Sequence, residues 1–119
     1  MADHLLKFKP GQSVTFEATT AIVGGRVVEV TGDRKVGTAG AASAKAIGTA
    51  GHDAAVGDNV VVHLAGPVDT FVAAGAIAAG ANVEAAASGK AQTATTGRVL
   101  GLSLNATTAA DQTVQVVRV

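Results

Sequence analysis

The sequence has no cysteine, tryptophan or tyrosine, and each absence removes a class of protein. Without cysteine there are no disulfides, no thiolate metal sites and no thiol nucleophile. Without tryptophan and tyrosine, a sugar-binding or base-stacking surface is not expected. No serine stands in a Gly-x-Ser-x-Gly elbow, and we therefore expect a protein that is not an enzyme.

An excess of charge of one sign is also missing, because nine Lys and Arg residues balance nine Asp and Glu residues. Neutralising phosphates needs clustered basic residues, so the balance argues against a nucleic-acid partner. No apolar run approaches the roughly 18 residues of a membrane-spanning helix, and residues 1–9 lack the apolar stretch of a signal peptide. We expect synthesis in a cytoplasm and no membrane partner.

Metal and cofactor motifs are absent as well. The three histidines are not spaced to aim two imidazoles at one ion, and the loop with His52 and Asp58 lacks the carboxylate spacing of a calcium site. Lys90 follows a glycine, but Ala91 stands where a phosphate loop needs Ser or Thr. The carboxylates, Glu84 among them, are scattered and look like solvated turn residues. We expect no metal, no cofactor and no catalytic residue.

What the sequence does contain is glycine, with 15 residues that interrupt valine-rich runs at short intervals. This pattern is typical of many short strands joined by tight turns. The expected strands are 13–17, 26–30, 45–50, 59–64, 68–72, 82–86, 90–94, 98–104 and 113–118. The large apolar residues are mostly valine and much of the rest is alanine, which makes a thin core for the length. A partner surface is expected to complete it.

Residues 1–11 differ from the rest of the chain. Leu5, Leu6 and Phe8 are interspersed with two lysines, and a Pro-Gly pair then breaks the chain before the first strand. We interpret 1–11 as an extended arm whose three large apolar side chains bind a partner, with a disordered terminus as the alternative. Residues 12–119 are expected to form a single all-β domain, a small barrel or sandwich.

An internal repeat is the most informative feature of the chain. Residues 45–64 are echoed without a gap at 98–117, so that Gly101 lies 53 positions after Gly48 and Asp111 lies 53 after Asp58. Each copy is a strand with a glycine, a loop, an acidic residue and a second strand. Glycine inside a strand marks a bulge or the close approach of another backbone, and the acidic residue suits a turn. All four residues are interpreted as structural.

Four stretches together carry a family resemblance: residues 46–50, 55–62, 74–83 and 96–101. They resemble the capsid decoration, or cement, proteins of tailed bacteriophages over roughly 14–119. The resemblance implies a structural virion protein, made in the host cytoplasm, that binds the outside of an icosahedral capsid. It would stabilise the shell by bridging subunits of the major capsid protein, as a homotrimer that lies between capsomers.

Two other functions stay open at this point. A soluble β-barrel that binds a small ligand, or serves as an accessory module of an enzyme, is compatible with the same strand pattern. A trimeric hydrolase of the deoxyuridine-triphosphate type is also small and β-rich, but its acidic and serine-containing nucleotide motifs are not found. A cement protein should bind assembled shells, whereas a ligand-binding module should bind without them.

Overall fold

The computed structural model describes residues 13–66 and 68–119, and almost all regular structure in this range is β-strand. The valine-rich runs form the strands, since β-branched side chains fit a pleated surface. The elements are β1 (Ser13–Ala18), β2 (Val27–Gly32), β3 (Lys35–Thr38), β4 (Ala46–Ala50), β5 (Asn59–His63), β6 (Val68–Val72), β7 (Asn82–Ala85), the 3-10 turn η1 (Ala87–Gly89), β8 (Ala91–Thr93), β9 (Gly101–Ser103) and β10 (Thr113–Arg118). The predicted all-β fold of short strands is confirmed.

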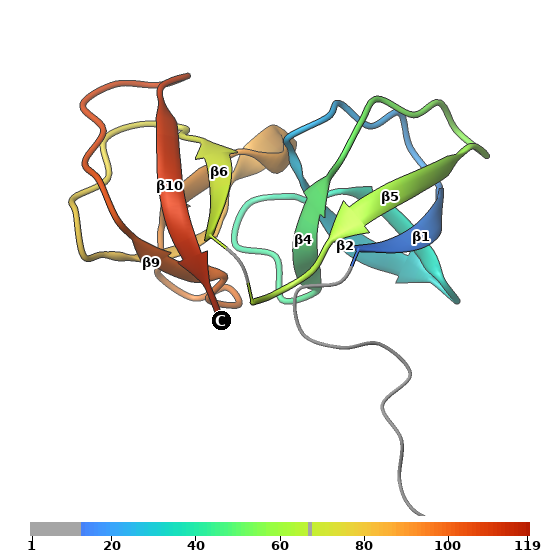
Figure 1. Ribbon diagram of the computed structural model, residues 1–119, viewed down its shortest axis with the longest axis horizontal. Coiled ribbons are helices and arrows are strands. Elements are labelled where there is room, and N and C mark those ends of the chain that lie inside the picture. Colours follow the sequence, from blue (N-terminus) through green and yellow to red (C-terminus); the bar gives the residue numbers. More distant parts are fainter. Residues whose placement is uncertain (1–12, 67) are drawn as a thin grey trace, which may run out of the picture.

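The first half of the chain closes into a five-stranded barrel in the order β1-β3-β2-β4-β5. β1 pairs antiparallel with β5 and parallel with β3, and these two pairings close the barrel. Side chains alternate along each strand, so that Val60 and Val62 of β5 are buried while Asn59 and His63 are exposed. We call residues 13–66 the first barrel (Figure 1).

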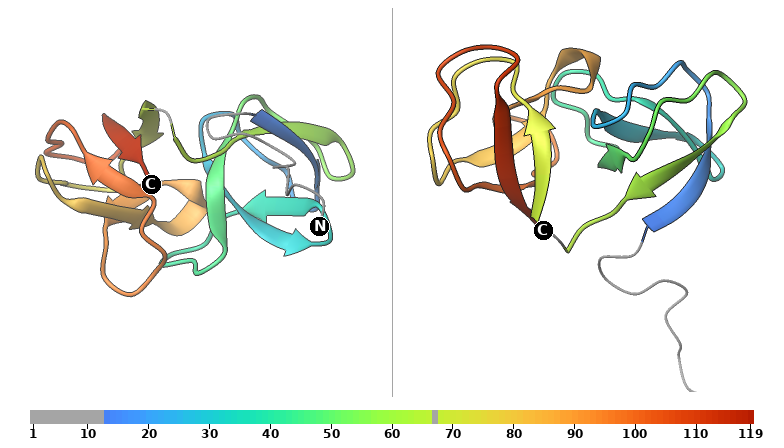
Figure 2. Two further views of the ribbon diagram at one scale, coloured as in Figure 1. Left: turned by 60° about the horizontal axis from the view of Figure 1, so that its bottom comes forward. Right: turned by 45° about the horizontal axis from the view of Figure 1, so that its top comes forward.

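The second half forms a sheet in the order β6-β10-β9-β7-β8. A parallel bridge between Ala73, just after β6, and Ala91 of β8 joins the two edge strands, as the parallel β1-β3 pair does in the first barrel. Every second residue of β10 is buried, from Val114 to Arg118. We call residues 68–119 the second barrel, which lies beside the first in the three views of Figures 1 and 2.

Each strand of the first barrel has a counterpart in the second: β1 and β6, β2 and β7, β3 and β8, β4 and β9, β5 and β10. Phe16 lies opposite Val60 in the β1–β5 pair, and Phe71 lies opposite Val114 in the β6–β10 pair. The neighbours of each strand correspond in the same way throughout both barrels. The strand-loop-strand repeat found in the sequence is therefore one part of a duplication that covers both halves of the described chain.

Backbone hydrogen bonds show that the two copies of the repeat differ by one inserted residue. The N–H of Ala18 donates to the carbonyl of Asp58 at 2.9 Å, and the N–H of Ala73 donates to the carbonyl of Gln112 at 2.8 Å. Gln112 is therefore the counterpart of Asp58, because the second loop holds one more residue than the first. The gapless pairing of Asp58 with Asp111 was wrong by this insertion.

Two details of the strand prediction were also wrong. No strand was expected between residues 30 and 45, whereas β3 covers Lys35–Thr38 and pairs with both β1 and β2. Residues 98–104 were expected to be one strand, whereas β9 covers only Gly101–Ser103. Arg98 does not join the ladder because its N–H donates instead to the carbonyl of Ser43 in the other barrel, at 3.1 Å.

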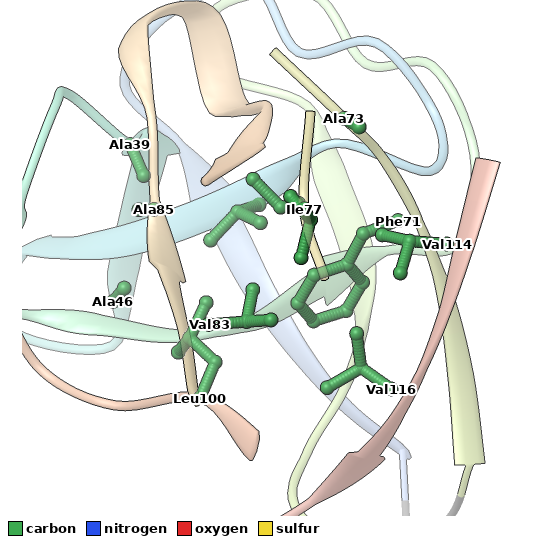
Figure 3. Packing of buried hydrophobic residues seen from close by; sticks show 12 residues of the cluster. Ala39, Ala46, Phe71, Ala73, Ile77, Val83, Ala85, Leu100, Val114 and Val116 are labelled. Atoms are coloured by element: carbon green, nitrogen blue, oxygen red, sulfur yellow. The ribbon is translucent and has the colours of Figure 1, made fainter. Parts of the chain in front are cut away.

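The buried hydrophobic residues form two clusters, and one of them crosses between the barrels. The cluster around Phe71 holds most of the buried side chains of the second barrel (Figure 3). It also includes Val27, Ala39 and Ala46 of the first barrel. The other cluster lies within the first barrel and consists of Ala18, Ile22, Val28, Val36, Ala50, Ala54, Val60 and Val62. The barrels therefore share a core, while the expectation of a single domain from 12 to 119 stays a prediction.

Backbone hydrogen bonds fasten the junction between the barrels. The N–H of Gly89 in η1 donates to the carbonyl of Ala39 at 2.9 Å, and the N–H of Ala42 donates to the carbonyl of Ala85 at 2.8 Å. The residues involved are small, which allows the two backbones to approach each other closely. We call this contact the intrachain junction.

Candidate interaction surface

The residues that the sequence singled out for partner binding, Leu5, Leu6 and Phe8, lie outside the described residues. Their role as an arm that binds a partner stays a prediction. The four turn and strand residues, Gly48, Asp58, Gly101 and Asp111, are described, and all lie in the two β-loop-β units that correspond between the barrels.

Gly48 in β4 and Gly101 in β9 occupy corresponding positions with the same steric reason for glycine. A Cβ at Gly48 would lie 2.1 Å from the carbonyl oxygen of His63, and a Cβ at Gly101 would lie 2.1 Å from that of Val117. Neither distance is possible for a real side chain. Both glycines therefore mark the close approach of a neighbouring strand, which is the structural role that the sequence indicates.

The two acidic residues of the repeat do different things. One Asp58 carboxylate oxygen accepts a hydrogen bond from the N–H of Ala55 at 3.2 Å, which closes a tight turn before β5. Asp111 has a positive φ of 66° and its carboxylate bonds to Lys90 Nζ at 2.6 Å. The hydrogen bond and charge of Lys90 lower the pKa of Asp111. Gln112 closes the second turn instead, by accepting from the N–H of Thr108 at 2.8 Å.

Glu84 corrects the interpretation that the carboxylates are solvated turn residues, because it lies in β7 and is fully buried. Its carboxylate accepts hydrogen bonds from the N–H groups of Thr95 and Gly97, at 2.9 and 2.8 Å, from the Thr95 hydroxyl and from Gln92. Burial raises the pKa of Glu84, but the hydrogen bonds outweigh it and lower the pKa from 4.5 to about 2. Glu84 is therefore an ionised anchor for the β8–β9 loop.

Arg118 is the second buried charge, and it lies at the junction of the barrels. Its guanidinium donates to the carbonyl of Leu100 at 2.9 Å and, across the junction, to the carbonyl of Ile47 at 3.2 Å. The Asp69 carboxylate lies 3.9 Å from Nη1 and accepts a hydrogen bond from the Thr49 hydroxyl of the first barrel at 2.5 Å. Burial lowers the pKa of Arg118, and the charge of Asp69 opposes this shift. The group links the barrels by polar contacts.

Sequence reasoning missed both buried charges. A glutamate between Val83 and Ala85 in a buried strand is a usable signal for Glu84, since a charge at such a position needs hydrogen-bond partners. Arg118 carries a similar signal, because the alternation along β10 places it on the buried face with Val114 and Val116.

Exposed aliphatic side chains gather on the outer face of the second barrel. Val117 of β10 lies between Val68 of β6 and Leu102 of β9, each of which pairs with it across the strands, and all three are exposed. We call these three residues the apolar row. Leu104 and Val119 extend exposed aliphatic surface along the same strands. Exposed contiguous apolar surface is typical of a site for another macromolecule.

The apolar row lies near the edge of the molecule at which the described chain starts and stops. β1 begins and β10 ends at the lower edge in Figure 1, and the linker from β5 to β6 also turns there. Ser13, the first described residue, pairs with His63 at the end of β5, and Val68 begins β6 a few residues later. The segment with Leu5, Leu6 and Phe8 therefore joins the described chain at this edge.

Residues 13–66 and 68–119 offer few features of other kinds of site. No pocket is found among them, and no group of three or more His, Cys, Asp or Glu residues is placed to hold a metal ion. None of the helical structure described is long and apolar enough to cross a membrane. The features that stand out in this range are the apolar row and the junction.

The described chain consists of a closed five-stranded barrel and a five-stranded sheet whose edge strands are joined by a bridge. Comparison with known proteins gives the family of this fold. The chain belongs to the phage cement protein family, whose model matches residues 8–118. It is therefore a structural phage protein associated with the capsid in the virion, from a family that is not one of enzymes.

A solved structure with the same fold is the N base of the head fiber protein gp8.5 in bacteriophage phi29. Its TM-score to this chain is 0.73 at 20% sequence identity, and the match covers 91% of this chain and 93% of that chain. No curated protein matches the sequence significantly. The resemblance to decoration proteins that the sequence indicated is confirmed.

Proposed function

We propose that this protein binds the outer surface of an assembled icosahedral phage capsid and stabilises it by bridging subunits of the major capsid protein. In this proposal the protein is made in the host cytoplasm and acts as a homotrimer. The observation that carries the proposal, together with the family, is the apolar row at the edge where residue 13 begins.

The edge offers two elements for a shell. Burying the apolar row against a shell lowers the free energy of the complex, by about 25 cal/mol per Å² of apolar surface removed from water. The segment before Ser13 carries Leu5, Leu6 and Phe8, which can add an extended strand to a shell subunit. Because Ser13 lies at the same edge as the apolar row, one shell surface can engage the row and the segment that precedes Ser13.

A modest contact per copy is sufficient for this role. Once one barrel or arm of a trimer is bound, the others bind at a high effective concentration, and the overall affinity exceeds that of any single contact. The zero formal net charge of the chain means that a dense layer of copies does not repel itself. Bridging then resists the outward pressure on the shell mechanically, without any chemistry.

Co-sedimentation with matching capsids, expanded and unexpanded, tests the proposal. We expect the wild-type protein to bind expanded shells saturably and to raise the temperature at which they rupture. Deleting residues 2–8 and the substitution Val68→Asp should each weaken binding, because each removes apolar surface from the same edge. Val56→Asp is the matched control, since Val56 is equally aliphatic and 68% exposed but lies in the β4–β5 loop.

Lack of binding to either form of shell would overturn the proposal. In that case the alternative function, a soluble β-barrel that binds a small ligand, becomes the hypothesis to test. If Val56→Asp and Val68→Asp weaken shell binding equally, capsid binding still stands, but the binding surface is not the edge that carries the apolar row.

A further inference from the structure

The duplication allows each position of the second barrel to be compared with its counterpart in the first. In the first barrel, Val27, Ala39, Ala46 and Thr49 are buried because the second barrel covers them. We call these four residues the covered face. Their counterparts in the second barrel define an equivalent face that no part of the described chain covers.

Strand pairing and hydrogen bonds fix the equivalence. Val27 pairs with Thr49 between β2 and β4, and Asn82 pairs with Leu102 between β7 and β9. The N–H of Ala39 donates to the carbonyl of Val27 at 3.0 Å. In the second barrel the N–H of Ala94 donates to the carbonyl of Asn82 at 2.7 Å.

Ala46 and Val99 complete the two sets, as each lies two residues before the corresponding glycine, Gly48 or Gly101. We call the second set, Asn82, Ala94, Val99 and Leu102, the open face. Val99 is 38% exposed and Leu102 is 39% exposed, whereas Ala46 and Thr49 are buried. At these two positions the larger aliphatic side chain stands in the uncovered face.

On the other side of the junction, a buried residue of the second barrel has an exposed counterpart in the first barrel. Ala85 of β7 lies in the junction and is buried, with its carbonyl bonded to Ala42 of the first barrel. Its counterpart is Val30 of β2, since Val30 pairs with Val36 as Ala85 pairs with Ala91. Val30 is 36% exposed. The first barrel therefore has an uncovered version of the surface that the second barrel uses in the junction.

We propose that the open face of the second barrel binds the first barrel of a second copy of this chain, through the surface around Val30. The contact brings together, between two copies, the counterparts of the two faces that form the junction within one copy, with Arg34 at the position of Gly89. It deepens the self-association in the proposed function and rests on that part of it, but not on shell binding. Such a head-to-tail contact closes into a ring or grows into a filament, and the trimer is the closed form.

The chemistry of the open positions favours a second copy. Within one chain, Thr49 bonds to Asp69 and Arg118 reaches across to Ile47. The counterpart of Thr49 is Leu102, and that of Arg118 is the half-buried Leu64 at the end of β5. At these two positions the junction within a chain is polar, whereas the contact between copies is apolar, and burial of apolar surface drives the association of separate molecules.

The positions of the chain ends also favour a second copy of the chain on the open face. Within one copy, β5 ends at the junction and the chain enters β6 a few residues later. The repeated junction places the end of β10 in one copy beside the start of β1 in the next. Ser13 of the second copy, the first residue described, then lies beside the apolar row of the first.

Sedimentation equilibrium of the purified full-length chain tests the proposal. We expect the wild type to self-associate, and Leu102→Asp and Val30→Asp each to weaken association about a hundredfold, because each buries a carboxylate in an apolar contact. Val56→Asp is again the control and should associate as the wild type does. Far-UV circular dichroism of each variant establishes that it is folded.

Mixing the two variants gives the decisive result. Leu102→Asp retains an intact first barrel and Val30→Asp retains an intact open face, so their mixture should form one-to-one dimers although each alone stays monomeric. A wild type that stays monomeric would overturn the proposal, and so would a mixture that stays monomeric while the wild type associates.

A disulfide provides a second measurement, since the chain has no cysteine of its own. Asp33 is the counterpart of Ser88, the residue before Gly89, and Ala94 is the counterpart of Ala39, which bonds to Gly89. The double variant Asp33→Cys/Ala94→Cys should therefore form covalent multimers on oxidation. The two single variants are controls and should give dimers at most. Association without shell binding would leave this proposal standing and defeat only the capsid function.

Discussion

At one cross-strand row on its outer face the first barrel carries Ser13, His63 and Thr49, and the second barrel carries Val68, Val117 and Leu102. Ser13 and His63 hydrogen-bond to each other at 2.9 Å, whereas the valines have only apolar surface to offer. The strand pairing beneath is the same. The comparison teaches that inward positions hold the fold of both barrels, while outward positions are free to acquire different partners.

The largest effect is expected from breaking a feature that both barrels share. Gly48→Ala and Gly101→Ala should each destabilise the protein by about 3 kcal/mol, because the new Cβ meets a backbone carbonyl that cannot move without its strand. Urea unfolding of each variant measures the change. Gly75→Ala is the control, since no described atom lies within 4 Å of a Cβ there. A large loss at only one of the two strand glycines would show that the barrels are not equivalent.

The next comparison concerns two corresponding glutamates. Glu29 accepts one hydrogen bond, from the N–H of Gly40 at 2.8 Å, where the buried Glu84 accepts several. Glu84→Gln should cost about 2 kcal/mol, because an amide offers fewer acceptor sites to buried donors, and Glu29→Gln should cost less than about 0.5 kcal/mol. Chemical denaturation at neutral pH compares the two variants. Equal losses would contradict the assigned anchoring role of Glu84.

Acid sharpens the same comparison. The pKa of Glu84 is lowered in the folded state, so its contribution to stability is present above the ordinary value of 4.5 and is lost as the pH falls from there towards about 2. The free energy of unfolding of the wild type should fall over this range. That of Glu84→Gln should fall less, and a parallel pH profile for the two proteins would contradict the expectation.

A smaller effect is expected from giving the second barrel the residues of the first at the junction. Asp69 and Arg118 correspond to Val14 and Leu64. Arg118→Leu alone should cost about 2 kcal/mol, because it leaves the Asp69 carboxylate without its counter-ion and two carbonyls without a donor. Adding Asp69→Val should recover about 1 kcal/mol of this loss, and a double-mutant cycle measures the coupling. Simple additivity would show that the pair does not act together.

The smallest effect concerns the turns before β5 and β10. Gly57 has a φ of 87° and its counterpart Asp111 a φ of 66°, so both backbones are left-handed. Gly57→Ala should cost about 1 kcal/mol for the conformation alone, since no described atom obstructs its Cβ. Asp111→Gly should relieve the same strain and lose the exposed contact with Lys90, with little net change. Thermal unfolding of both variants measures whether Gly57→Ala loses stability while Asp111→Gly does not.

The sequence predicted the strands well where valine, phenylalanine and threonine are dense over five or six residues, as in β5, β6 and β10. It missed β3 because Lys35–Thr38 has one large apolar residue, Val36, beside a glycine. Only the tertiary pairing with β1 and β2 makes that segment a strand. It found the repeat where Gly48 and Gly101 anchor a gapless match, and missed the rest because loop insertions and deletions separate the remaining strands.

The candidate surface was less accessible to sequence reasoning. The alternation in Val114–Arg118 indicates which residues of β10 point outward, but not that Val68 and Leu102 flank Val117, because β6 and β9 are distant in the sequence. Likewise, the junction depends on two barrels packing together, which no local pattern encodes. The partner-binding residues proposed from the sequence, Leu5, Leu6 and Phe8, stay a prediction.

The core shared between the barrels has a consequence for cooperativity. Val27, Ala39 and Ala46 of the first barrel pack in the cluster around Phe71, so the second barrel cannot open without exposing apolar surface of the first. The two barrels are therefore expected to unfold together and not one at a time. Amide hydrogens in both should exchange through one common opening of the whole molecule, so that neither half is expected to unfold before the other.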